Sequence, residues 1–246
     1  MNRRGAETQS GEQQTIASSA PLRLCGENVW LIWQLADSAF PTGGFAHSGG
    51  LEAAYQHRAL RGGHELAAYL RVALGQLTHA SLPFVHAAFF GERSFFEVDS
   101  SCDAFLSSHV ANRASRLQGQ ALLATCERTF ASEPLSQFRD EVIGGACSMH
   151  GAPVFGRVAK LMGLDSEATA RLFIFTQLRG WISAAVRLNI VGPLEGQRVQ
   201  HGLAGEAERC AARFGQVGLG DVAQAAPLLD LWQGTQDRLY SRLFQT

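Results

Sequence analysis

The residues best placed to do chemistry lie in a glycine-rich stretch, PTGGFAHSGGLEAA, at positions 41–54. Ser48 stands there with small residues two positions before it and two positions after it, which is the pattern of a nucleophile elbow. In such an elbow a strand runs into a sharp turn and a helix, so that the serine oxygen is exposed and the next backbone N–H helps to form an oxyanion hole. Aspartate and histidine residues also follow Ser48 in the order that a triad requires. A serine hydrolase that uses Ser48 is therefore one hypothesis.

The sequence before Ser48 does not supply the strand that an elbow requires. Residues 42–47 contain two glycines and one β-branched residue, a composition that disfavours a strand. Residues 30–40 suit a helix better. An α/β-hydrolase also needs strands and helices that alternate along the chain, and this alternation is missing. We therefore expect no catalytic residues and a protein that is not an enzyme, with the Ser48 hydrolase kept as the alternative.

Two residues could contribute to a metal site. Cys147 and His150 are three positions apart, and both are suitable ligands for nickel or zinc. Two ligands do not complete a site, so the favoured interpretation is a packed cysteine and a hydrogen-bonded histidine, with a metal-storing helical protein as a further alternative. His79 and His86 are separated by Pro83, which interrupts a continuous helix face. No metal or cofactor site is predicted.

Composition excludes several classes of function. Lys160, in RVAKLM, is the single lysine, so the chain has no Walker A nucleotide-binding loop. A formal net charge of −1 gives no strong attraction to nucleic acid or to an anionic membrane. The five cysteines are scattered and form no Cys-x-x-Cys pair, which favours reduced thiols in a cytoplasmic protein.

The remaining sequence reads as helices. Residues 66–77 place apolar side chains at i, i+3, i+4 and i+7, and residues 105–126 continue the same rhythm. Gly163 can end one helix, and Asp165 or Ser166 can cap the next. The apolar window 172–191 contains two arginines and is expected to be a buried core helix rather than a membrane span. Residues 203–214 are again helical in pattern, and strand signals are nearly absent.

These patterns predict one all-α domain, a helical bundle over residues 25–221. The polar residues 1–24 are expected to form a disordered N-terminal arm. A glycine-rich break at 215–221 precedes a C-terminal segment, residues 222–246, that is rich in large apolar side chains. Such a segment is expected to dock either on the body of the same chain or on a partner.

Separated blocks of the sequence, in order, resemble urease accessory proteins of the UreF family. The blocks are WQLADSAFPTGGFAHS at 33–48, RASRLQGQALL at 113–123, MHG and VFG within 149–156, LRGWISAAVRLNIVGPLEGQ at 178–197 and LYSRLF at 239–244. Many bacterial members carry VGAFSYS where this chain has TGGFAHS, and the version here is more similar to the plant-type branch.

The resemblance implies a helical, non-catalytic protein that acts in nickel insertion into apo-urease. It implies a homodimer that binds the accessory protein UreD/UreH, recruits the GTPase UreG and regulates GTP-dependent nickel delivery. None of these partners follows from composition or spacing.

Three groups of residues are candidates for contact with such partners. The first lies in the glycine-rich turn, whose shape could alternatively reflect backbone geometry alone. The second is a stripe of arginines in the helix expected over 172–191, which could face an acidic partner, act on the GTPase nucleotide as an arginine finger, or form a solvated face. The third is the C-terminal segment. The candidates are Phe45, His47 and Ser48, expected to be exposed on the turn; Arg179 and Arg187; and Tyr240, Arg242, Leu243 and Phe244.

Overall fold

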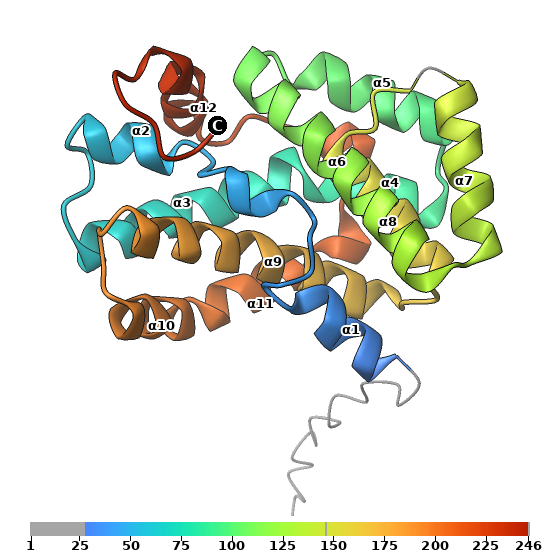
Figure 1. The fold of residues 1–246 in the computed structure, drawn as a ribbon, viewed down its shortest axis with the longest axis horizontal. Helices are drawn as coiled ribbons and strands as arrows, with labels where there is room; N and C mark the ends of the chain where they lie inside the picture. The colour runs from blue at the N-terminus through green and yellow to red at the C-terminus, as the bar shows by residue number, and fades with distance from the viewer. Residues whose placement is uncertain (1–27, 146, 246) are drawn as a thin grey trace, which may run out of the picture.

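The computed structural model describes residues 28–145 and 147–245, and within them the secondary structure is entirely helical (Figure 1). The predicted all-α class is therefore confirmed, whereas the predicted arm at 1–24 lies outside the described residues. The α-helices are α1 (Val29–Ala36), α2 (Leu51–Gln56), α3 (Gly63–Ala80), α4 (Leu82–Phe90), α5 (Phe95–Phe105), α6 (His109–Phe130), α7 (Glu133–Gly144), α8 (Gly151–Leu161), α9 (Ser166–Arg187), α10 (Pro193–Gly202), α11 (Ala204–Ala212) and α12 (Pro227–Thr235). Short 3-10 helices are η1 (Gly44–Ala46), η2 (Phe214–Gln216), η3 (Leu219–Asp221) and η4 (Gln236–Arg238).

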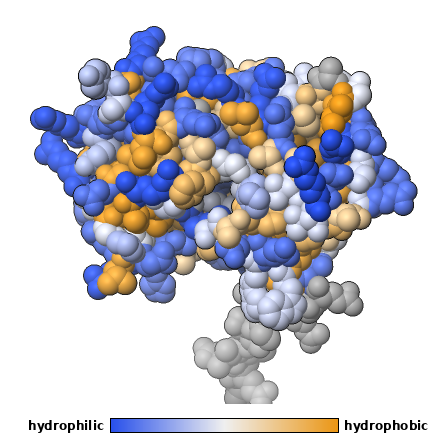
Figure 2. Space-filling model, in the orientation of Figure 1, coloured by the Kyte–Doolittle hydropathy of each residue, from blue (hydrophilic) through white to orange (hydrophobic). Residues whose placement is uncertain are grey.

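Helix α9 is the central element, as the apolar window predicted. The left-handed Gly163 (φ +76°) separates it from α8, and the Asp165 carboxylate accepts the N–H of Ala168 at 2.6 Å to cap its first turn. Helices α1, α3, α10 and α11 pack around α9, while α4 to α8 form the other half of the bundle (Figure 1). No helix in the described part of the chain is long and apolar enough to span a bilayer. On the face drawn in Figure 2, apolar residues are interspersed with hydrophilic ones.

Two glycines allow α8 to approach its neighbours closely. A Cβ built on Gly156 would lie 2.2 Å from the carbonyl oxygen of Val85 in α4, and one built on Gly119 in α6 would lie 2.0 Å from the carbonyl oxygen of Met149. Neither contact is possible for a real side chain without movement of the backbone. The packing of α4, α6 and α8 therefore depends on these two positions having no side chain.

Two helix boundaries differ from the sequence pattern. The apolar rhythm over 105–126 is interrupted, because α5 ends at Phe105 and α6 begins at His109, with the Ser108 hydroxyl accepting the N–H of Ala111 at 3.5 Å. The first helix ends at Ala36 rather than near residue 40. Its end coincides with an Asx turn, in which the Asp37 carboxylate accepts the N–H of Ala39 at 2.9 Å.

Gly156→Ala is expected to destabilise the protein by about 2–3 kcal/mol, because the new methyl group would force α8 away from the backbone of α4. Chemical denaturation of the variant measures this loss. Gly75→Ala is the matched control: a Cβ at Gly75, in the interior of α3, meets nothing within 4 Å. That substitution is expected to leave stability unchanged or to raise it by about 0.5–1 kcal/mol. Equal effects of the two substitutions would contradict the close-packing account.

Candidate partner surface and the cleft beside it

The glycine-rich turn is a left-handed bend followed by the start of α2. Gly49 and Gly50 have φ values of +63° and +89°, which disfavour any residue with a side chain. A Cβ on Gly49 would also lie 2.7 Å from the indole nitrogen of Trp181, and one on Gly50 would lie 3.0 Å from the backbone nitrogen of Gln233. The turn is therefore shaped by its close contact with α9 on one side and α12 on the other.

The expectation that three residues of this turn are exposed is wrong for two of them. Phe45 is 68% exposed, but His47 is 8% exposed and Ser48 is fully buried. Ser48 turns inward because its hydroxyl accepts the N–H of Glu52 at 3.3 Å, at the start of α2. Burial, together with the positive charge of Arg113, lowers the pKa of the His47 imidazole.

The nucleophile-elbow interpretation of Ser48 is also wrong. The residues before Ser48 form the 3-10 helix η1 and not a strand, and the hydroxyl is inaccessible. A buried serine that hydrogen-bonds the first turn of a helix is in a structural position, and it cannot attack a substrate from there.

Arg187 holds the turn to α9. Its guanidinium donates to the carbonyl oxygen of Phe45 at 2.6 Å, and its central carbon lies 3.8 Å from the Phe45 ring centroid and 4.3 Å from that of Phe244. Such stacking between a cation and two aromatic faces is favourable. Burial lowers the pKa of Arg187, and the negative charge of Glu52 opposes this effect.

The arginine stripe therefore makes its contacts within the chain. Arg179 donates to the carbonyl oxygen of Ala36, at the end of α1, and burial lowers its pKa. The bland interpretation from sequence was a solvated or salt-bridged face of a buried helix, and in the structure each of the two arginines instead binds a backbone carbonyl of its own chain.

The C-terminal segment packs on the body of the same chain, and the buried Glu52 carboxylate fixes it there. One carboxylate oxygen accepts the N–H of Leu243 at 2.6 Å, and the other accepts the Gln236 side-chain amide at 2.6 Å and the N–H of Phe244 at 3.1 Å. Sequence reasoning missed Glu52, because a single glutamate in the first turn of a helix normally indicates a favourable helix-end charge. The N–H of Gln245 also donates to the carbonyl oxygen of Ala46 at 2.9 Å.

A second set of contacts ties the segment to α6. The Asp237 carboxylate accepts hydrogen bonds from Arg113 at 3.0 Å and from Arg242 at 2.9 Å, and it lies 3.2 Å from the ring of His109. We call residues 44–52 and 236–245, joined by these contacts and by Arg187, the turn–tail unit. Of the predicted partner residues in it, Phe244 is buried and 3% exposed. Phe45, Tyr240, Arg242 and Leu243 remain accessible, with Tyr240 fully exposed and Leu243 53% exposed.

The possible metal ligands Cys147 and His150 serve the start of α8. The Cys147 thiol donates to the Asp99 carboxylate at 2.9 Å, and the same carboxylate accepts the N–H of Met149 at 3.1 Å and that of His150 at 2.7 Å. Burial raises the pKa of Cys147 to about 12, so the thiol stays protonated at neutral pH. No group of three or more potential ligands occurs in residues 28–145 and 147–245. The favoured interpretation of a packed thiol and a hydrogen-bonded histidine agrees with these contacts.

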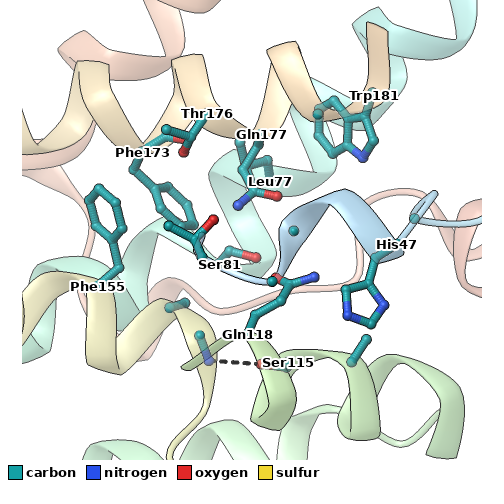
Figure 3. Close-up of a pocket in the computed structure, with 18 of the residues that line it drawn as sticks. His47, Leu77, Ser81, Ser115, Gln118, Phe155, Phe173, Thr176, Gln177 and Trp181 are labelled. Atoms are coloured by element: carbon teal, nitrogen blue, oxygen red, sulfur yellow. Dashed lines mark hydrogen bonds between the residues drawn. The ribbon is translucent and has the colours of Figure 1, made fainter. Parts of the chain in front are cut away.

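A cleft of about 540 Å³ lies beside the turn–tail unit. Its walls come from the turn, from α6 and α8, from the junction of α3 and α4, and from α9. Figure 3 shows apolar rings, Phe155 and Phe173, on one side and polar side chains, among them His47, Gln118 and Gln177, on the others. The cleft therefore combines an apolar wall with groups that can form hydrogen bonds.

The family model for UreF matches residues 60–204, more than half of the chain. The chain belongs to the UreF family. Proteins named urease accessory protein F from Oryza sativa subsp. indica and from Arabidopsis thaliana are 40% and 39% identical over 223 and 219 residues. These alignments cover 89% and 87% of this chain, and 85% and 91% of the relatives.

A bacterial relative extends the comparison. Urease accessory protein UreF from Mycobacterium tuberculosis (strain ATCC 25177 / H37Ra) is 32% identical over 217 residues, which cover 87% of this chain and 97% of the relative. The two plant proteins are thus more similar to this chain than the mycobacterial one is, in line with the plant-type form of its turn. Family membership supports a role for the chain in urease maturation.

Glu52→Ala is expected to free the C-terminal segment, because it leaves the buried N–H of Phe244, the part-buried N–H of Leu243 and the buried Gln236 amide without this acceptor. The expected loss of stability is about 2–3 kcal/mol, with faster amide hydrogen exchange confined to residues 236–245 and 44–52. Glu141→Ala, at an exposed position in α7, is the control and is expected to change neither quantity. Unchanged exchange in the tail of the Glu52 variant would show that the carboxylate does not hold it.

Proposed function

We propose that this UreF-family protein is an adaptor that joins a UreD/UreH-type accessory protein and a UreG-type GTPase at apo-urease and regulates GTP-dependent nickel delivery. It acts in the cytoplasm as a homodimer and performs no catalytic step of nickel delivery itself. Nickel is the cargo of the assembled complex. Membership of the UreF family supports the urease role, and the partners and the regulation are the parts proposed here.

The observation that carries the proposal is the construction of the turn–tail unit. Two segments almost 200 residues apart in sequence are joined by the buried Glu52 carboxylate and by Arg187, and the resulting unit leaves large side chains in solvent. A pre-ordered surface binds a partner at a lower entropic cost than a mobile segment. The side chains that remain accessible, Tyr240, Leu243, Phe45 and Arg242, include types that often dominate binding energy at interfaces.

The candidate residues divide into two roles. Phe244, Arg187 and Ser48 hold the unit together from inside, and we assign direct contact with a partner to the accessible residues. His47 supports the turn from the side of the cleft (Figure 3). Loss of an inner residue is then expected to weaken partner binding through disorder of the unit, and loss of an accessible residue through the contact alone.

The arginine contacts favour regulation through assembly over donation of an arginine finger. Arg179 and Arg187 each bind a carbonyl oxygen of their own chain, so either would have to break this contact to reach a nucleotide on another protein. The proposed effect on the GTPase is therefore to position it within the complex.

The decisive experiment is a quantitative pull-down with a candidate UreD/UreH partner. Tyr240→Ala and Leu243→Asp alter only side chains that face solvent, so the fold is expected to persist and partner affinity to fall by about 30-fold. Leu194→Asp is the matched control: Leu194 is 77% exposed on α10, outside the turn–tail unit. Wild-type affinity in both tail variants, or an equal loss in the control, would refute this assignment of the surface.

A further inference from the structure

Three side chains from three elements form a continuous line beside the cleft. The Ser115 hydroxyl oxygen, on α6, lies 3.1 Å from Nδ1 of His150, which immediately precedes α8. Nε2 of the same ring lies 3.0 Å from a carboxylate oxygen of Asp103 on α5. A hydroxyl, an imidazole and a carboxylate in this order form the arrangement by which a serine is activated as a nucleophile.

The neighbouring hydrogen bonds indicate which group donates and which accepts along this line. The Ser115 oxygen accepts the N–H of Gly151 at 3.1 Å, drawn as the dashed line in Figure 3, so its own hydrogen is available to Nδ1 of His150. The tautomer that satisfies both ends carries its proton on Nε2 and donates it to Asp103. Hydrogen bonds from Asn112 and from His150 lower the pKa of Asp103, which keeps this carboxylate ionised. The imidazole of His150 thus lies between the two groups, with Nδ1 facing the Ser115 hydroxyl and Nε2 facing the Asp103 carboxylate.

The exposure of the three side chains differs, with His150 buried and Asp103 46% exposed. The His150 ring is completely buried, whereas Ser115 is half-buried and lines the cleft. The base is thus shielded from water, and the hydroxyl can be reached from the cleft. The apolar rings of Phe155 and Phe173 offer a wall for the acyl portion of a substrate (Figure 3).

The N-terminus of α8 supplies a donor for a developing negative charge. The first N–H groups of a helix have no acceptor within the helix. Those of His150 and Gly151 bind Asp99 and Ser115, and Pro153 has none. The N–H of Ala152, which lines the cleft beside Ser115, has no acceptor among the described residues. Although the Asp99 carboxylate offsets the positive end of this helix, an unpaired N–H near a nucleophile is one component of an oxyanion site.

We propose that Ser115 is an activated nucleophile, with His150 as its base and Asp103 as a positioning residue, and that it accepts an acyl group from a small ester bound in the cleft. The Ser115 oxygen forms a bond to the carbonyl carbon while its proton passes to Nδ1 of His150. The bond from that carbon to the leaving alcohol then breaks, and His150 returns the proton to the departing oxygen. Water then attacks the acyl carbon and gives a proton to His150. The bond from that carbon to the Ser115 oxygen breaks, His150 returns the proton to this oxygen, and the acid is released. This chemistry goes beyond the adaptor role and does not depend on it.

The site is separate from the serine hydrolase considered from sequence. Ser48 is buried against α2, whereas Ser115 lies on α6 and reaches His150 across the α6–α8 contact. The close approach of these helices at Gly119 brings the groups together. Since the three residues are 12 and 35 positions apart in sequence, no local motif marks them.

The test is covalent labelling of the full chain, carried out separately with a fluorophosphonate and with p-nitrophenyl butyrate. Intact mass measures the number of adducts, and peptide mapping identifies the modified residue. Wild-type protein is expected to carry one adduct, on Ser115, with a matching release of p-nitrophenolate, and Ser115→Ala is expected to carry none. Ser81→Ala is the control, because Ser81 also lines the cleft but no described histidine binds its hydroxyl. Asp103→Asn is expected to slow labelling by about 100-fold without a change in melting temperature, and Asp103→Glu to restore part of the rate.

Each other outcome opposes the proposal. Absence of an adduct on Ser115 in folded wild-type protein, or a labelling rate unchanged in Asp103→Asn, would show that the three residues only cap α8. Failure here leaves the adaptor proposal intact, because Ser115→Ala lies outside the turn–tail unit and is expected to bind the UreD/UreH partner with wild-type affinity.

Discussion

The partner surface depends on one buried carboxylate. Removal of an ionised glutamate from water is costly unless hydrogen-bond donors replace the water. For Glu52 these donors are the Gln236 side chain and the backbone N–H groups of Leu243 and Phe244, from the C-terminal segment, together with a longer bond of 3.5 Å from the Gln56 side chain in α2. The requirement is mutual, because the N–H of Phe244 and the Gln236 amide are buried and would otherwise lose this acceptor. The ordered position of the tail and the burial of Glu52 therefore depend on each other. Together they hold residues 236–245 against the turn at residues 44–52.

Arg187 complements this interaction from the opposite direction. It places a positive charge near Glu52 and fills the space between the rings of Phe45 and Phe244, one from the turn and one from the tail. The planar guanidinium can stack on two rings and donate to the Phe45 carbonyl at once, which a lysine could not do. The attraction between Arg187 and Glu52 and the stacking of Arg187 on the two rings thus favour the same position of the tail against the turn.

The sequence predicted the elements well and the exposure of the site poorly. Apolar spacing indicated α3 and α9, and the Gly163–Asp165 pair marked the boundary before α9, because these signals depend on neighbours within one or two turns. The break between α5 and α6 was missed, because no glycine or proline marks it. Ser108 caps the start of α6 there. The inward position of Phe244 depends on Glu52 and Arg187, which are far away in the sequence, and the burial of Ser48 was not marked by its residue type although its hydrogen-bond partner, the N–H of Glu52, is only four residues away. Residue type and spacing carry no information about which distant group will cover a side chain.

The 3-10 helix η1 links the two regions to which we assign function. Phe45 at its centre faces solvent beside the tail, whereas His47, immediately after it, points into the cleft (Figure 3). At Gly49 and Gly50 the backbone lies so close to Trp181 and α12 that neither position has room for a side chain. The glycines therefore permit both the bend and its close packing against the neighbouring helices, and a turn of this kind can present a surface and define a cavity at the same time.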